Sequence, residues 1–175
     1  IANRKIVEPR YGSEMIPNTF SHIAIDFASV TQWPFLRILD NVKKLSLYTD
    51  GFGQMLLVKG YESEGHDSAH PDYGNNFNRR AGGLEECHFV TKRLGDYNCR
   101  GGVHVNATEF YPEAKYYSDD LLTGGKGWAW LDQAIYADKR YDIISGKLYH
   151  RFEEMDEAAP YIDWIYVDVY FGVGW

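Results

Sequence analysis

Four short segments rich in Val, Ile and aromatic residues recur along the chain, and they constrain its fold more than any other feature. They are His22–Ser29, Gln54–Tyr61, Gly101–Thr108 and Ile162–Tyr170. Each segment is nearly continuous in apolar residues rather than strictly alternating, which is typical of strands buried on both faces of a parallel sheet. The pattern therefore predicts an α/β fold with four parallel strands.

Helical patterns lie between these segments. Pro34–Tyr48 and Gly83–Tyr97 carry apolar residues at helical spacing, and a weaker pattern covers Tyr136–Met155 with an interruption at Gly146. Strands that alternate with helices predict βαβ units with right-handed crossovers. Four such units are half of an eightfold barrel, although four units alone also fit an open doubly wound sheet.

Charge and hydropathy narrow the possible partners. The chain has a net charge of −7, which argues against nucleic acid as a partner because phosphate binding needs a basic surface. The same charge argues against docking on anionic membranes. No run approaches the roughly 20 apolar residues that a membrane-spanning helix needs.

The two ends of the chain lead us to expect a piece of a longer protein. The segment Ile1–Tyr11 is polar and unlike a signal peptide, the chain starts without Met, and it stops shortly after an apolar segment. The two cysteines, Cys87 and Cys99, are expected to be free, partly buried thiols, with a disulfide as the alternative.

Asp168 lies close to the end of the last predicted strand. A carboxylate at that position would project into the mouth of a barrel, where such folds place their chemistry. Glycoside hydrolysis normally uses a pair of carboxylates, one of which attacks the anomeric carbon in the retaining version. The alternative is an aspartate that caps a loop or a following helix.

The segment Gly65–Gly74 (GHDSAHPDYG) gathers two histidines and two aspartates, namely His66, His70, Asp67 and Asp72. Imidazoles and carboxylates bind sugar hydroxyls, and they also bind metal ions. The spacing fits no helix-borne zinc motif, and a solvated turn would use the same residue types. Sugar binding, a metal site and a plain loop therefore all stay open.

Two further groups could belong to a site. His104 and Asn106 alternate along the third strand and so face the same side; a buried structural histidine is the alternative. The segment Gly127–Trp130 places two tryptophans in a glycine-rich stretch. These rings could close over a sugar as a lid or anchor a long loop in the core.

Motifs of other enzyme classes find little support. Gly101-Gly102 and Gly124-Gly125 complete neither a dinucleotide-binding nor a Walker pattern. The chain has no GxSxG elbow of a serine hydrolase and no CxxC pair.

Four blocks taken together resemble family 101 of the glycoside hydrolases, the endo-α-N-acetylgalactosaminidases. They cover Leu39–Gly74, Gly101–Tyr117, Gly127–Ile143 and Ile162–Tyr170 and include the motifs GHDS…HPDYG, HVNA…YPEAK and GWAWLDQ. Their order and approximate spacing match as well, and the likeness extends over most of the chain.

The resemblance implies a (β/α)8 barrel of the TIM type, of which residues 1–175 supply roughly the first four β/α units as part of a catalytic domain. The parent protein would be secreted or attached to the cell wall. Its reaction would be retaining release of the disaccharide Galβ1-3GalNAc from Ser or Thr of mucin-type glycoproteins, without a cofactor or metal. The remaining half of the barrel would be the partner that completes the fold.

The resemblance also implies roles for individual residues. Asp168 matches the nucleophile, Asp67 the carboxylate that binds GalNAc, and His104 a sugar-binding histidine. The lid tryptophans match Trp128 and Trp130.

His66 and Asn106 lie in the matching motifs and are expected to bind substrate. The acid/base glutamate of the family lies on the strand after the nucleophile strand, and Glu109 does not match it. After Asp168 the family usually continues Val-Trp-Gly-Asn, whereas this chain reads Val-Tyr-Phe-Gly-Val. A non-catalytic carbohydrate-binding remnant is therefore the alternative to an enzyme.

Overall fold

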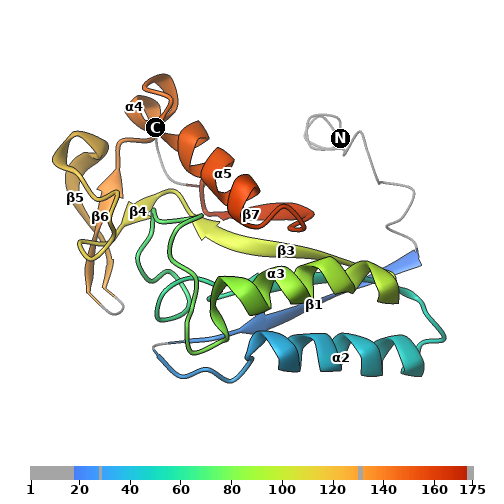
Figure 1. Cartoon of the computed structure of the whole chain (residues 1–175). Helices are drawn as coiled ribbons and strands as arrows, with labels where there is room; N and C mark the ends of the chain where they lie inside the picture. The colour runs from blue at the N-terminus through green and yellow to red at the C-terminus, as the bar shows by residue number, and fades with distance from the viewer. Residues whose placement is uncertain (1–17, 28, 130–131, 173–175) are drawn as a thin grey trace.

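A four-stranded parallel sheet forms the centre of the molecule (Figure 1). The computed structural model describes residues 18–27, 29–129 and 132–172. The sheet runs in the order β1 (Thr19–Ile25), β2 (Gly53–Lys59), β3 (Cys99–Asn106) and β7 (Trp164–Asp168), with every neighbouring pair parallel. The prediction of four parallel strands is confirmed.

Two helices lie side by side on one face of this sheet (Figure 1). Helix α2 (Phe35–Tyr48) buries Phe35, Ile38, Leu39 and Val42, and helix α3 (Gly83–Leu94) buries Cys87, Val90 and Leu94. Each fully buried apolar side chain of this size stabilises the fold by roughly 1.5–3 kcal/mol. The two helical patterns are therefore confirmed, with α3 followed by a short 3₁₀ turn at Gly95–Tyr97.

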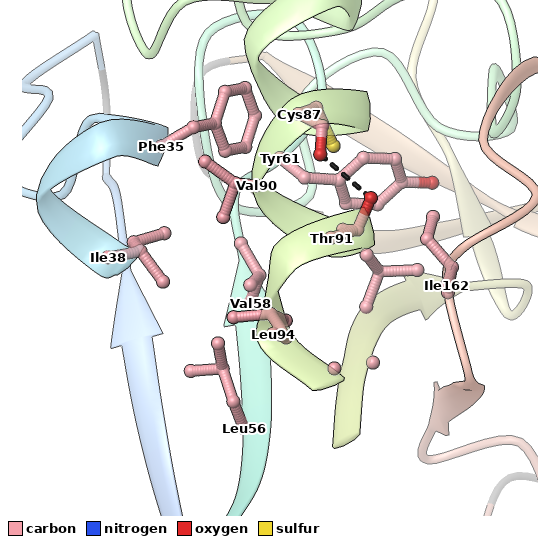
Figure 2. Close-up of a pocket in the computed structure, with 13 residues that line it drawn as sticks. Phe35, Ile38, Leu56, Val58, Tyr61, Cys87, Val90, Thr91, Leu94 and Ile162 are labelled. Atoms are coloured by element: carbon pink, nitrogen blue, oxygen red, sulfur yellow. Dashed lines mark hydrogen bonds between the residues drawn. The ribbon is translucent and has the colours of Figure 1, made fainter. Parts of the chain in front are cut away.

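The seam between these helices and the sheet is tightly packed (Figure 2). Side chains from α2, α3 and the strands surround a void of only about 10 Å³, too small and too apolar to hold a ligand. Cys87 and Cys99 are both buried and free, so the disulfide alternative is wrong. Thr91 donates a hydrogen bond to the carbonyl of Cys87 within α3, as Figure 2 shows.

The paired glycines of β3 are explained by close contacts on both faces of the sheet. A Cβ atom at Gly101 would lie 2.3 Å from Cδ1 of Leu94, on the helix side. A Cβ atom at Gly102 would lie 2.2 Å from the indole ring of Trp164. The absence of a side chain at these two glycines therefore lets Leu94 and Trp164 pack directly on the β3 backbone.

The stretch after β3 is more ordered than the sequence indicates. The sequence shows no clear strand pattern between the third and fourth apolar segments, yet a second, antiparallel sheet forms there in the order β4 (Glu109–Phe110), β6 (Gln133–Ala137) and β5 (Leu122–Ala129). A 3₁₀ turn, Asp119–Leu121, precedes β5. The helix predicted over Tyr136–Met155 begins too early in the sequence, because its first residues belong to β6.

Helices α4 (Lys139–Ile144) and α5 (Lys147–Ala158) follow, and they separate at Gly146 as the interrupted pattern indicated. Gly146 has a φ of 78°, in the left-handed region that glycine adopts without strain.

Burial on both faces holds only for the central strands. In β3 only Arg100 is exposed, whereas most residues of β1 and β7 are half-buried or exposed. The reason is topological, because β1 and β7 are the two outer strands among the described residues. Among the described helices, none is long and apolar enough to cross a membrane.

Candidate active site at the carboxyl ends of the parallel strands

The ends of β3 and β7 place three of the predicted residues next to one another. In the β3–β7 register, His104 is opposite Tyr166 and Asn106 is opposite Asp168. Side chains two residues apart on a strand share a face, so these four residues project from the same side of the sheet. His104 and Asn106 are almost completely buried.

The loop after β2 brings His66 and Asp67 to the same place. Oδ1 of Asp67 lies 3.3 Å from Nδ1 of His66 and 3.5 Å from Nδ1 of His104. Asp67 is 2% exposed, and its φ of 61° is unusual for a residue other than glycine. Such strained backbone is often found at functional sites.

His104 links the two carboxylates of the site. Its Nε2 lies 3.4 Å from Oδ2 of Asp168, while its Nδ1 faces Asp67. The His104 imidazole lowers the pKa of Asp168 to about 2, with a smaller contribution from the Tyr166 hydroxyl and against the opposing effect of burial. Asp168 is therefore an ionised carboxylate throughout the physiological pH range, as a nucleophile must be.

Asn106 connects the strand end to the loops around it. Its side-chain Nδ2 donates to Oδ2 of Asp67 at 3.5 Å, and its Oδ1 accepts from the backbone N–H groups of Thr108 (2.9 Å) and Glu109 (3.1 Å). Its own backbone N–H donates to Nδ1 of His70 at 3.1 Å. Asn106 thus fixes both the carboxylate of Asp67 and the start of β4.

His70 is a fully buried residue that packs against the site: its Nδ1 lies 3.8 Å from Oδ1 of Asp67, and its ring stacks on that of His104 with centroids 6.2 Å apart. Its Nε2 lies 3.0 Å from Oε1 of Glu62, and both side chains are fully buried. Burial alone would lower the pKa of His70, but the neighbouring Glu62 carboxylate outweighs it and the pKa is raised. Asp72 is also structural, since its carboxylate accepts the backbone N–H groups of Lys115 and Tyr116.

The two predicted lid tryptophans differ in what can be said of them. Trp128 lies on β5, is 49% exposed, and its ring approaches the His66 ring edge-on with centroids 6.5 Å apart. Trp130 lies outside the described residues.

Three residues of the site could hold a metal ion. Single ligand atoms of His66, Asp67 and His104 all lie within 4.8 Å of one another. The metal site that the sequence left open lay within Gly65–Gly74, so its ligands would be His66, Asp67 and His70, without His104. The structure does not favour that set, because His70 Nδ1 already accepts the Asn106 N–H and its Nε2 faces Glu62.

Sequence reasoning missed three residues that belong to this region. Tyr166 hydrogen-bonds Asp168, and its position two residues earlier on the same strand was the available signal. Glu109 lies 9% exposed beside β5, and its carboxylate accepts the Trp128 N–H. Glu62 gave no signal, because nothing in a sequence marks which glutamate is buried under a histidine.

The acid–base behaviour of His66 provides a test of this geometry. Burial lowers the pKa of His66 to about 4, although Asp67 opposes the shift. The ordinary value is 6.5, so the unfolded chain binds more protons than the folded chain between these two values, and stability should fall as the pH drops through this interval.

We expect an NMR titration of the His66 ring to show a midpoint near pH 4. His66→Asn should reduce the acid-induced loss of stability between pH 6.5 and pH 4. A midpoint near 6.5 would contradict the buried position of the ring beside Asp67.

Comparison with known proteins identifies the family to which the chain belongs. The family model described as endo-alpha-N-acetylgalactosaminidase matches residues 1–175. A provisionally named endo-alpha-N-acetylgalactosaminidase of Renibacterium salmoninarum is 47% identical over the whole chain, which spans only 12% of that relative's length.

Solved structures agree on the fold. The ligand-free α-N-acetylgalactosaminidase NagBb of Bifidobacterium bifidum superposes with a TM-score of 0.69 at 17% identity, covering 87% of this chain and 28% of that one. An α-amylase of Geobacillus thermoleovorans gives a TM-score of 0.63 at 9% identity, covering 91% and 40%. These neighbours are TIM-barrel glycosidases matched over part of their length. With the family model matching every residue, the chain belongs to the endo-α-N-acetylgalactosaminidase family of glycoside hydrolases, family 101, and has the parallel α/β fold of part of a TIM-type barrel.

Proposed function

We propose that this chain supplies the nucleophile and the donor subsite of a retaining endo-α-N-acetylgalactosaminidase. The enzyme would release Galβ1-3GalNAc from Ser or Thr of mucin-type glycoproteins. The observation that carries the proposal is the setting of Asp168, an ionised carboxylate at a parallel-strand end, held beside His104 and Tyr166. The charge and position of Asp168 are those that attack on an anomeric carbon requires.

The reaction follows the two steps of a retaining glycosidase. Asp168 attacks the anomeric carbon from the face opposite the α-linked oxygen and forms a covalent β-glycosyl-enzyme, while the bond to the Ser or Thr oxygen breaks. Water then displaces Asp168 and restores the α configuration. Ligand atoms of His66, Asp67 and His104 lie within 4.8 Å of one another, and these side chains would orient the hydroxyls of the sugar.

Residues 1–175 would be part of a catalytic barrel domain. The general acid/base would come from the strand that follows β7 in a complete barrel. We place the parent protein outside the cell or on the cell wall, where mucin-type glycoproteins are accessible.

The test uses the full-length protein that contains this chain. Incubation with an aryl α-glycoside of Galβ1-3GalNAc should release the disaccharide, and proton NMR at early times should show the α anomer as the first product. Appearance of the β anomer first would overturn the retaining mechanism.

The same assay separates the competing functions. Binding of the disaccharide without release would favour a non-catalytic carbohydrate-binding module. Loss of release after EDTA treatment, with recovery on adding back a divalent metal, would favour a metal site at His66, Asp67 and His104; we expect EDTA to have no effect.

A further inference from the structure

A buried glutamate contacts the backbone of the predicted lid. Glu109 begins β4 and is 9% exposed, and its Oε2 accepts the backbone N–H of Trp128 at 3.1 Å. Burial raises the pKa of Glu109, the hydrogen bond from Trp128 opposes this, and the carboxylates of Asp67 and Asp168 add to the increase. Burying a carboxylate costs free energy, and the hydrogen bond from the Trp128 N–H offsets part of that cost.

The residue before Trp128 is packed directly on the same carboxyl group. A Cβ atom at Gly127 would lie 2.8 Å from Cδ of Glu109 and 2.9 Å from its Cγ. The carbonyl of Gly127 accepts a second hydrogen bond from Nε2 of Gln133 at 2.9 Å. The backbone at 127–128 is therefore held between Glu109 and Gln133, and any side chain at 127 would push the Glu109 carboxyl group away.

The position of Glu109 is in turn set by Asn106, which also contacts Asp67. Its backbone N–H donates to Oδ1 of Asn106 at 3.1 Å, and Nδ2 of the same Asn106 lies 3.5 Å from Asp67. A continuous polar path thus leads from Asp67 through Asn106 and Glu109 to the backbone of Trp128. The Trp128 ring, at the far end of that path, is in edge contact with His66.

We propose that Glu109 is a positioning residue that holds Trp128 over the donor subsite. The inference rests on the proposed function, in which Trp128 covers a bound sugar. The observed contact of the carboxylate is with the backbone of β5 at Trp128, so its role in this proposal is to fix where the indole lies. The hydrogen bond is charge-assisted, which makes it stronger than an ordinary backbone contact.

Hydrogen exchange of the Trp128 amide tests the contact without any sugar. In the full-length protein, Glu109→Ala should speed exchange of this amide by on the order of tenfold. Glu109→Gln keeps an acceptor oxygen and should restore most of the protection. Gly127→Ala displaces the carboxyl group from the other side and should reproduce the effect of Glu109→Ala, which guards against misfolding of a single variant.

A double-variant comparison tests whether Glu109 acts through Trp128. The Kd for Galβ1-3GalNAc, measured by calorimetry, should rise about fivefold to tenfold in Glu109→Ala and recover in Glu109→Gln. Glu109→Ala should add nothing in a Trp128→Ala background, because the indole to be positioned is then missing.

The outcomes separate the two proposals. Unchanged amide exchange in both Glu109→Ala and Gly127→Ala, or fully additive effects of Glu109→Ala and Trp128→Ala on Kd, would overturn the role of Glu109. Faster exchange in the variants, together with no measurable disaccharide binding by the wild-type protein, would leave the contact between Glu109 and the Trp128 backbone in place. It would nevertheless refute the proposed function, and with it the positioning of Trp128 over a sugar.

Discussion

Replacing Asp168 by asparagine should reduce release of Galβ1-3GalNAc from an aryl α-glycoside by about 10³-fold or more, because an amide cannot form the glycosyl-enzyme. The substitution conserves size and keeps an oxygen next to Nε2 of His104, which lies 3.4 Å from Oδ2 of Asp168. Binding of the disaccharide should therefore change much less than turnover. Release is measured spectroscopically with the full-length protein and binding by calorimetry.

The aryl substrate makes this experiment sensitive to the nucleophile. An aryl leaving group needs little protonation, so the rate depends less on the general acid than it does with a glycopeptide. The pKa of Asp168 is about 2, so ionisation of this residue should produce no acid limb in the pH profile of the wild-type protein between pH 4 and 7.

A matched control for Asp168→Asn lies at the other end of β7. Asp163 immediately precedes β7, accepts the Gly101 N–H at 2.9 Å and pairs with Arg100 at 3.0 Å. Asp163→Asn makes the same chemical change away from the site and should leave turnover within about twofold of wild type. Equal losses in the two variants would show that the effect is one of folding, and a fully active Asp168→Asn would exclude Asp168 as the nucleophile.

The central sheet could be predicted because its strands and helices each show a characteristic pattern of apolar residues within a short stretch of sequence. Continuous apolar segments such as Gly101–Thr108 occur where strands are covered on both faces, and helix α2 carries its apolar residues on one side. The second sheet could not be predicted in this way. Its strands β4 and β5 both pair with β6 and are short or irregular in register, so their pairing depends on distant contacts.

The site was only partly predictable for a related reason. Alternation along β3 predicted that His104 and Asn106 share one face, the strand-end position singled out Asp168, and Asp67 lay in the polar segment Gly65–Gly74; the family resemblance added only the roles of Asp67 and Asp168. Nothing in spacing shows that His70 turns inward to Glu62, or that Glu109 reaches the backbone of Trp128. The first contact lies within one loop and the second joins strands β4 and β5; both depend on burial, which a single sequence does not display.

Removing the charge of Arg151 should destabilise this region by about 3–5 kcal/mol, because it would leave a buried carboxylate without its partner. Nη2 of Arg151 donates to Oδ2 of Asp142 at 2.6 Å, and both residues are 1% exposed. The guanidinium also lies 5.4 Å from the ring centres of Tyr73 and Phe110. The pair therefore joins helices α4 and α5 to Phe110, the residue after Glu109.

The measurement compares Arg151→Met with a surface control. Arg93 pairs with Asp96 at 2.8 Å, but both side chains are about half exposed, so Arg93→Met should change stability by about 0.5 kcal/mol or less. Denaturant unfolding of the full-length protein, with hydrogen exchange followed in α5, reports the two changes in the region concerned.

A double substitution decides whether the loss comes from the unpaired charge. Arg151→Met combined with Asp142→Leu removes both charges, so it should recover most of the stability lost in Arg151→Met alone. If the double variant is as unstable as the single one, the stacking of the guanidinium between Tyr73 and Phe110 is the larger contribution. Recovery would instead mean that the ion pair itself adds little net stability, and that its two charges are tolerated in the interior because each neutralises the other.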